Sequence, residues 1–514
     1  MPKRGQSAAP KGGRKQVKEE VDYSLWEDIG NQLRIDSARA IRVTKSGHPT
    51  SSSSIADLLS VLFFHPQGIK FHANNPKHFL NDRLVLSKGH AAPALYAAYY
   101  RAGIFTEEQL LSLRLKGSMV EGHPVPKIPF VDVATGSLGQ GLSVAAGMAY
   151  SSKFFDKINN RIFCICGDGE VAEGSIWEAA NFASYYKLNN LICFVDVNRM
   201  GQSQDTMFGH DLAAYESRFK TFGWNTVKID GHNIKQIVNS IENAFSEKNT
   251  NKPTVVICKT EKGKGFTEAV EGKINWHGKD LGNEFDNSIE LLKGKIKREE
   301  IEYKTYPPEG DEPMFDEGKV VIKPDYKAED KISTRKAYGN GLLKAHECNS
   351  QVIGLDGDMR NSTFSITLFE KYPEAYVECF IAEQNMVGVA TGLSCRRKLA
   401  FCSTFAAFFS RAGDQIRIAG ISGSNIKIVG SHSGCSIGED GPSQMGLEDL
   451  AFFRTLPNGL VVIPSDGVAA EKSVELVANY NDGPAFIRTA RMDVPIIYPN
   501  EEEFELGKCK KWVT

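Results

Sequence analysis

Short apolar runs that end in polar turns recur along the chain and alternate with segments of helical periodicity. The runs at 161–166 (RIFCIC) and 191–197 (LICFVDV) flank an amphipathic segment from Ser175 to Leu188. Two buried strands on either side of a helix are typical of a βαβ unit in a parallel sheet. The first half of the chain therefore predicts a parallel α/β domain.

A second α/β pattern follows a charged, proline-bearing stretch that lacks periodicity. Its expected strands lie in QVIGLDGD, AFCSTF, NIKIVGSHS, LVVIPSD and AFIRTA. We predict two consecutive parallel-sheet α/β domains, at 21–293 and 332–500, joined by a linker at 294–331. Residues 1–20 are rich in Lys, Arg, Gly and Pro and are expected to be a disordered basic tail. Residues 501–514 are interpreted as the start of an absent C-terminal domain.

Composition and charge narrow the class of protein. Hydrophobic residues make up 41% and charged residues 24%, and 61 Lys and Arg nearly balance 63 Asp and Glu. This balance argues against a nucleic acid or membrane partner. No apolar run reaches the roughly 18 residues that span a bilayer, and no secretory signal precedes the domains. None of the 10 cysteines forms a CxxC pair, so we expect reduced thiols in a cytoplasmic protein. The basic tail is compatible with a nuclear pool.

Polar residues follow two of the expected strands. The run at 161–166 leads into Gly167-Asp168-Gly169-Glu170, and the run at 191–197 leads into Asn198. The carboxyl ends of neighbouring parallel strands meet at one edge of a sheet, where ligands bind. One carboxylate and one amide oxygen suit a hard divalent cation that also coordinates a diphosphate. GDG alone would favour the interpretation that these polar residues lie in ordinary turns. The complete pattern of strand, GDGE, helix, strand and DVN is much more specific for a ligand site than GDG alone.

This pattern is the thiamine-diphosphate fingerprint, and the sequence resembles animal-type transketolases from about Leu25 to its end. The blocks that carry the resemblance are SGHPTSSSS, NDRLVLSKGHAAPALYA, EGHPVP, DVATGSLGQGLSVAAGMAY, GDGEVAEGSIWEA, WHGK, IAEQNM, FCSTFAAFFSRA and SIGEDGPSQM. The resemblance implies a diphosphate-binding (PP) domain followed by a pyrimidine-binding (Pyr) domain. It also implies transfer of a two-carbon ketol unit from a ketose phosphate, such as xylulose 5-phosphate, to an aldose phosphate, such as ribose 5-phosphate, in the pentose phosphate pathway.

The resemblance assigns the cofactor contacts. Asp168, Asn198 and the Met200 carbonyl would hold a divalent cation, Mg²⁺ or Ca²⁺. The glycine-rich loop at 136–141 opens a small-residue helix, where backbone N–H groups can bind phosphate, although such a loop is equally often a packing turn. The residues expected to contact thiamine diphosphate are His90, Gly136, Ser137, Leu138, Gly169, Asn198, Lys262, His277, Glu383, Phe405, Phe408, Arg411 and Gln444.

Glu383 lies between two apolar stretches and is expected to be buried. A buried carboxylate costs several kcal/mol unless it is paired, so the residues alone leave a site acid and a structural acid equally open. The resemblance makes Glu383 the acid that hydrogen-bonds the pyrimidine ring of the cofactor and controls its tautomer. In the family this glutamate and the diphosphate site come from different subunits, which implies a homodimer with shared active sites. Phe405, Phe408 and Arg411 follow a three-residue spacing that would also suit one face of a core helix.

Five of the 11 histidines lie in glycine- or tryptophan-flanked turns: His48, His90, His123, His277 and His432. The other six, His232 among them, have ordinary contexts. A lone histidine is more often structural, but an imidazole can relay protons to a sugar hydroxyl. By resemblance the five line the channel between substrate and cofactor, and Glu383, His123, His277 and His432 are the catalytic residues. The residues expected to contact substrate are His48, Gln202, His277, Arg335, Ser362, His432, Asp440 and Arg488.

Three alternatives remain open at this point. A 1-deoxyxylulose-5-phosphate synthase has a similar domain order and would use pyruvate, although the motif blocks argue against it. A catalytically silent transketolase-like subunit would dimerise with a full-length paralogue. A nicotinamide dehydrogenase is disfavoured because no GxGxxG follows a first strand.

Overall fold

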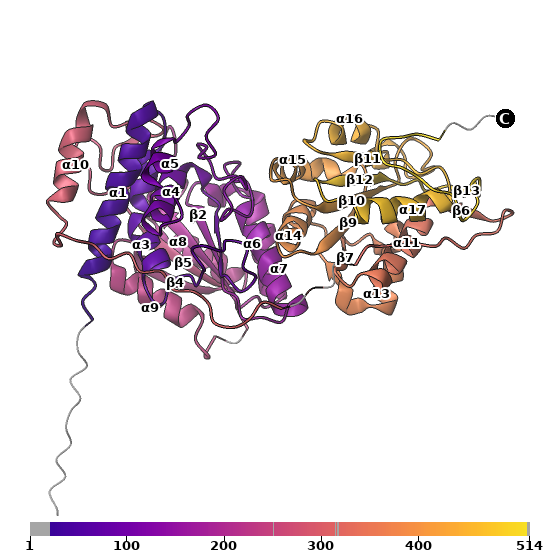
Figure 1. Cartoon of the computed structure of the whole chain (residues 1–514), viewed down its shortest axis with the longest axis horizontal. Coiled ribbons are helices and arrows are strands. Elements are labelled where there is room, and N and C mark those ends of the chain that lie inside the picture. Colours follow the sequence, from indigo (N-terminus) through magenta and orange to yellow (C-terminus); the bar gives the residue numbers. More distant parts are fainter. Residues whose placement is uncertain (1–20, 250, 314, 316–317, 511–514) are drawn as a thin grey trace, which may run out of the picture.

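The computed structural model describes residues 21–249, 251–313, 315 and 318–510. The predicted basic tail at 1–20 and the last residues, 511–514, lie outside the described residues. Figure 1 shows two lobes, an indigo-to-magenta one built from the first half of the chain and an orange-to-yellow one built from the second. Each lobe contains a parallel sheet between helices, so the predicted fold class of two consecutive parallel-sheet α/β domains is confirmed.

The sheet of the first domain has five parallel strands in the order β1-β2-β3-β5-β4. Its strands are β1 (Arg83–Leu86), β2 (Ile162–Gly167), β3 (Leu191–Val197), β4 (Asn225–Asp230) and β5 (Thr254–Lys259). Its helices are α1 (Ser24–Thr44), α2 (Pro49–Ser54), α3 (Ala56–Phe64), α4 (Ala92–Arg101), α5 (Glu107–Leu111), α6 (Gly141–Tyr150), α7 (Gly174–Tyr185), α8 (Leu212–Thr221), α9 (Ile234–Ala244) and α10 (Phe285–Lys293).

Side chains along β2 alternate between two apolar layers. Phe163 and Ile165 pack with α1, α3, α4 and α9, whereas Cys164 and Cys166 pack with α6, α7 and α8. A strand buried on both faces needs apolar residues at every position, which is why this run shows no polar alternation. Helices therefore cover both faces and leave the strand ends as the accessible edge.

The sheet of the second domain has six parallel strands in the order β11-β12-β10-β9-β7-β8. Its strands are β7 (Val352–Asp356), β8 (Tyr376–Glu378), β9 (Leu399–Phe405), β10 (Ile426–Ser431), β11 (Leu460–Val462) and β12 (Ala485–Arg488), and β6 (Lys331–Ser333) pairs separately with β13 (Asp493–Pro495). Its helices are α11 (Thr334–Cys348), α12 (Arg360–Thr363), α13 (Ile366–Lys371), α14 (Glu383–Cys395), α15 (Gly413–Ile421), α16 (Asp449–Phe453) and α17 (Gly467–Ala478).

The segment between α10 and β6 forms no helix or strand among its described residues, yet it contacts both domains. The backbone N–H of Lys297 donates to Asp28 (3.0 Å) in the first domain, and that of Val320 donates to Asn479 (3.1 Å) in the second. In the described part of the chain, no helix is both long enough and apolar enough to cross a membrane.

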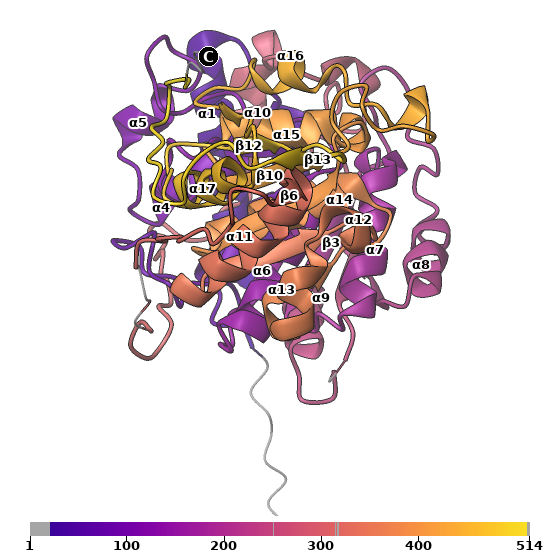
Figure 2. The same ribbon diagram turned by 90° about the vertical axis from the view of Figure 1, so that its right-hand side faces the viewer.

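The two domains pack through α6 and α14, whose contact extends the apolar layer of the first domain into the core of the second. Figure 2 views the chain from the side of the second domain, with α14 in front of the first domain. Glycines allow the close approach: a Cβ at Gly147 or Gly392 would overlap a backbone carbonyl of the facing helix, and one at Gly388 would overlap Ser143. These positions therefore have no room for a side chain.

We expect Gly392→Ala to destabilise the folded chain by about 1–3 kcal/mol, since overpacking a tight core costs this much. The added methyl group would meet the Val144 carbonyl and force α6 and α14 apart. Urea unfolding would measure the loss. Gly174→Ala is the matched control, because a Cβ there meets no atom within 4 Å. Equal stability of the two variants would contradict the tight helix contact.

Candidate active site

The carboxyl edge of the first sheet carries the predicted cation ligands. Asp168 follows β2, Asn198 follows the neighbouring strand β3, and both are buried with Met200. The Asp168 carboxylate accepts from the backbone N–H of Arg199 (2.7 Å). Burial and the nearby charge of Asp196 raise the pKa of Asp168 to about 6. A divalent cation would offset this cost, so the buried oxygens fit such an ion.

Asp196, which no sequence motif singled out, contacts several groups at this edge of the sheet. Its carboxylate forms a close ion pair with Lys88 and accepts from Ser54 (2.7 Å), Thr260 (2.5 Å) and the amide nitrogen of Asn198 (2.8 Å). Burial raises the pKa of Asp196, but the Lys88 ammonium and these donors outweigh burial and lower it. The contact fixes the Asn198 amide with its oxygen directed away from Asp196. One signal was available: Asp196 is the acid within the apolar run LICFVDV.

Four of the predicted histidines converge beside this edge. The ring of His48 lies 5.3 Å from that of His90, 6.2 Å from that of His123 and 5.0 Å from that of His277. Lys262 lies within 2.9 Å of Nδ1 of His277. Burial and neighbouring positive charge lower the pKa of His48 to about 3 and that of His277 to about 4. These imidazoles are therefore uncharged at neutral pH in the ligand-free chain.

The glycine-rich loop at 136–141 packs against the ring of His123. Gly136 has φ +126°, and a Cβ there would lie 2.7 Å from the His123 ring. A non-glycine residue is disfavoured in this left-handed conformation. Asp414 of the second domain accepts hydrogen bonds from Ser137 and from Gln140 (2.5 Å), so one end of the loop rests on α15.

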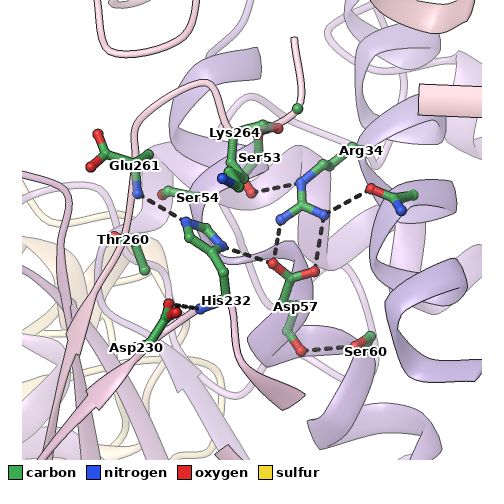
Figure 3. A network of polar contacts seen from close by, with 12 residues as sticks. Arg34, Ser53, Ser54, Asp57, Ser60, Asp230, His232, Thr260, Glu261 and Lys264 are labelled. Carbon is green, nitrogen blue, oxygen red and sulfur yellow. Dashed lines mark hydrogen bonds and ion pairs between the residues drawn. The ribbon is translucent and has the colours of Figure 1, made fainter. Parts of the chain in front are cut away.

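A buried polar network beneath the sheet edge anchors the segment that carries Lys262 (Figure 3). Arg34 forms a bidentate ion pair with Asp57, whose Oδ2 lies 2.8 Å from Nδ1 of His232. Nε2 of His232 accepts from the backbone N–H of Glu261 (2.9 Å). Burial raises the pKa of Asp57, but Arg34 and His232 outweigh it and hold this pKa below its usual range. His232 has an ordinary sequence context, yet its ring joins Asp57 on α3 to the backbone of Glu261.

We expect His232→Gln to destabilise the chain by about 1–3 kcal/mol, because the Glu261 N–H and the Asp57 carboxylate lose a buried partner. The neighbouring Lys262 should then be less well placed, so binding of thiamine diphosphate should weaken too. Denaturant unfolding and a cofactor titration would measure the two effects. His346→Gln is the control, since its ring contacts the Val352 carbonyl (2.8 Å) and the Tyr372 ring (centres 4.9 Å apart), both in the second domain. Cofactor affinity equal to that of the control would make the network purely structural.

The second domain brings the predicted aromatic residues together. Phe405, at the end of β9, stacks on Phe408 with ring centres 5.1 Å apart and on His432 at 3.7 Å. Phe408 and Arg411 lie in a short 3₁₀ helix, so the three-residue spacing does not mark one face of a core helix. Arg411 donates to Glu383 (2.8 Å), the first residue of α14, which is 4% exposed. Arg411 also lies over the Phe408 ring (5.3 Å to its centre), so it links the buried carboxylate to the stacked aromatic rings.

Two arginines that are predicted to contact the substrate phosphate lie in the second domain, in different environments. Arg335 at the start of α11 donates to the Ser362 carbonyl (2.8 Å), and its guanidinium lies 3.5 Å from His432. Its Nε is buried and has no hydrogen-bond partner among the described residues, so it is free for a ligand. Arg488 at the end of β12 is instead paired with Asp449 (2.8 Å). Burial and Arg335 lower the pKa of His432 to about 4.

The remaining predicted residues lie in loops. Asp440 forms an ion pair with Arg491 (3.3 Å), Gln444 ends a short 3₁₀ turn, and Gln202 is exposed beyond β3. Among the described residues, no hydrogen bond, ion pair or ring contact joins the histidine group of the first domain to Phe405, Phe408 or His432. The predicted residues therefore form two half-sites, one in each domain.

Comparison with known proteins identifies both domains. Residues 26–300 match the family of the transketolase thiamine diphosphate binding domain, and residues 330–496 match that of the transketolase pyrimidine binding domain. Human transketolase is 50% identical over 488 residues, which cover 94% of this chain and 77% of that protein. Transketolase-like protein 2 of Bos taurus is 50% identical over 489 residues, covering 95% and 77%. The crystal structure of transketolase from Campylobacter jejuni matches with a TM-score of 0.80 at 27% identity, covering 93% of this chain and 80% of that chain.

Two parallel-sheet domains, matched separately to diphosphate-binding and pyrimidine-binding families, define a thiamine-diphosphate-dependent enzyme. The half-sites described above lie within those two matches. At this level of identity to animal proteins, the chain belongs to the transketolase family. The resemblance seen in the sequence is confirmed.

Proposed function

We propose that this transketolase moves a two-carbon ketol unit from xylulose 5-phosphate to ribose 5-phosphate, as in the pentose phosphate pathway. The observation that carries the proposal is the buried carboxylate of Glu383, which Arg411 links to the stacked rings of Phe405 and Phe408. Aromatic rings such as these can pack against a flat heterocycle, and the acid near them can hold a proton at a ring nitrogen. A solved relative from Pichia stipitis, with 25% identity and a TM-score of 0.77, is a complex with sedoheptulose-7-phosphate.

The cofactor would span both half-sites. Asp168, Asn198 and the Met200 carbonyl would hold Mg²⁺ or Ca²⁺, and buried His48 Nδ1 and Ser51 Oγ, which have no partner among the described residues, fit a polar ligand. Bound thiamine diphosphate supplies the nucleophilic carbon that takes up the two-carbon unit. The residues that would hold its diphosphate are His90, Gly136, Ser137, Leu138, Gly169, Asn198, Lys262 and His277, and those that would hold its pyrimidine are Glu383, Phe405, Phe408, Arg411 and Gln444.

Proton handling falls to uncharged imidazoles. The pKa values of His123, His277 and His432 are lowered, mainly by burial. Each can accept a proton from a sugar hydroxyl and return it without first losing one to solvent. The cationic groups of Arg335 and Arg488 would hold the substrate phosphate, since guanidinium groups pair well with phosphate. Ser362, His48, Gln202 and Asp440 would contact the sugar.

A homodimer would complete the site, with the two half-sites supplied by different subunits. Among the described residues, no hydrogen bond, ion pair or ring contact joins the histidines of the first half-site to the aromatic rings of the second, and an apolar patch lies exposed just before Glu383. In this patch Tyr185 is 64% exposed, Phe380 40% and Ile381 71%, and the rings of Tyr185 and Phe380 are in contact. Exposed apolar surface of this kind is typical of an interface. We assign the dimer to the cytoplasm, with sugar phosphates rather than nucleic acid or membrane as its partners.

A coupled assay of the purified chain tests the proposed reaction. Xylulose 5-phosphate, ribose 5-phosphate, thiamine diphosphate and Mg²⁺ are expected to give product that depends on every component. Pyruvate in place of the ketose phosphate should give none, in contrast to a 1-deoxyxylulose-5-phosphate synthase. A folded dimer that binds the cofactor but turns over no sugar would contradict the proposal and favour the silent subunit.

A further inference from the structure

A second buried carboxylate, Glu170, lies beneath the loops of the first half-site and has no assigned role. It follows Gly167-Asp168-Gly169, begins a short 3₁₀ turn and is only 2% exposed. We infer that Glu170 is a positioning residue that joins three loops into one binding surface for the diphosphate of the cofactor. The inference rests on the proposed function, because the loops belong to the proposed cofactor site.

The contacts of Glu170 reach all three loops. Its Oε2 accepts from the backbone N–H of Gly167 (2.9 Å) at the end of β2. Its Oε1 accepts from the N–H of Gly139 (2.8 Å) and from the hydroxyl of Ser87 (2.5 Å). Ser87 Oγ accepts in turn from the N–H of Gly141 (3.0 Å), the first residue of α6. One side chain thus connects segments that lie 31 and 83 residues away in the sequence.

These contacts determine which backbone donors remain for a ligand. Glu170 and Ser87 take the N–H groups of Gly139 and Gly141. The N–H groups of Gly136, Ser137 and Leu138 donate to no group in the part of the chain that the structure describes. Gly139 has φ +89°, a left-handed conformation in which the loop turns tightly. The carboxylate therefore fixes the Gly139 end of the loop and leaves the N–H groups of Gly136, Ser137 and Leu138 available to a ligand.

Glu170 acts through other groups rather than on a ligand. Both of its oxygens accept donors from the protein, and its side chain is enclosed. A carboxyl group suits the position because all three groups that face it donate, and both of its oxygens can accept. The amide group of glutamine has the same size, but its N–H₂ would face one of these donors. Neither that N–H₂ nor the donor facing it would then have an acceptor.

Glu170→Gln tests the role, with Asp466→Asn as the matched control. Asp466 is also buried and accepts three backbone N–H groups, from Ala469 (2.8 Å), Ile497 (2.8 Å) and Tyr498 (2.9 Å), but it lies in the second domain. The dissociation constant of thiamine diphosphate with Mg²⁺, measured by calorimetry, should rise about 10- to 100-fold in Glu170→Gln, as for other residues that orient ligand-binding groups. It should change less than about twofold in the control.

Hydrogen exchange of the cofactor-free protein provides a second readout. The backbone amides at 136–141 should exchange faster in Glu170→Gln than in the wild type, because this substitution releases the loop. Their exchange rates should be unchanged in Asp466→Asn. Cofactor affinity and loop exchange that match the wild type would overturn the inference. Failure of the wild-type chain to bind thiamine diphosphate would instead overturn the proposed function. If Glu170→Gln does not fold, Ser87→Ala removes one of the three contacts, and unchanged affinity in that variant would also count against the inference.

Discussion

Turnover in Glu383→Gln is expected to fall about 10²- to 10⁴-fold at saturating cofactor, the range that a positioned acid or base contributes. The amide keeps the size of the side chain and its contact with Arg411, but it cannot hold or release the proton. Steady-state rates with xylulose 5-phosphate and ribose 5-phosphate would measure the loss. Cofactor affinity should change far less than turnover, since the stacked aromatic rings are intact.

Glu471→Gln controls for loss of a buried glutamate. Glu471 is 1% exposed and is paired with Lys344 (2.7 Å), much as Glu383 is paired with Arg411, but it lies on α17, and no ring contact of Phe405 or Phe408 among the described residues involves it. This variant should retain wild-type turnover. Activity of Glu383→Gln within tenfold of the wild type would remove Glu383 from the reaction.

Mixing two inactive variants should restore activity if the two half-sites come from different subunits. Glu383→Gln disables the second-domain half-site and Asp168→Ala the first. Each dimer that contains one chain of each kind has one intact site and one doubly damaged site. At equal concentrations and free exchange, about a quarter of the wild-type activity should return, because half of the dimers are mixed and each has one of two sites.

The matched control mixes Glu383→Gln with Glu383→Ala, which damage the same half-site and should restore nothing. Native mass spectrometry would establish that the mixed dimers form. Mixed dimers without activity would show that each site is complete within one chain, and the proposed sharing would then be wrong.

The repeating local pattern allowed much of the fold to be predicted. The run at 191–197 became β3 with the same bounds, and the segment from Ser175 became α7, because buried strands and amphipathic helices each have a characteristic period. Asp168 and Asn198 were found for the same reason, since parallel strands that lie side by side bring the residues that follow them to one edge.

The groups that support the site could not be found in this way. Asp57 and His232 are 175 residues apart, and Ser54 and Asp196 are 142 apart. Which donor a buried carboxylate finds depends on packing that brings together distant segments, and no local period records it. Glu170 was visible in the GDGE motif, but only the structure shows that its carboxylate faces inward to Gly139 and Ser87.

The glycine contacts between α6 and α14 limit how freely the two domains can be exchanged between relatives. A side chain larger than hydrogen at Gly388 or Gly392 requires a compensating change on α6, which belongs to the other domain. Residues at these positions in one domain therefore constrain the facing helix of the other, even though each domain has its own sheet. A chimera that takes 332–500 from a relative with a larger residue at either position should fold only when α6 is taken from the same source, so such an exchange must treat the pair of domains as one unit.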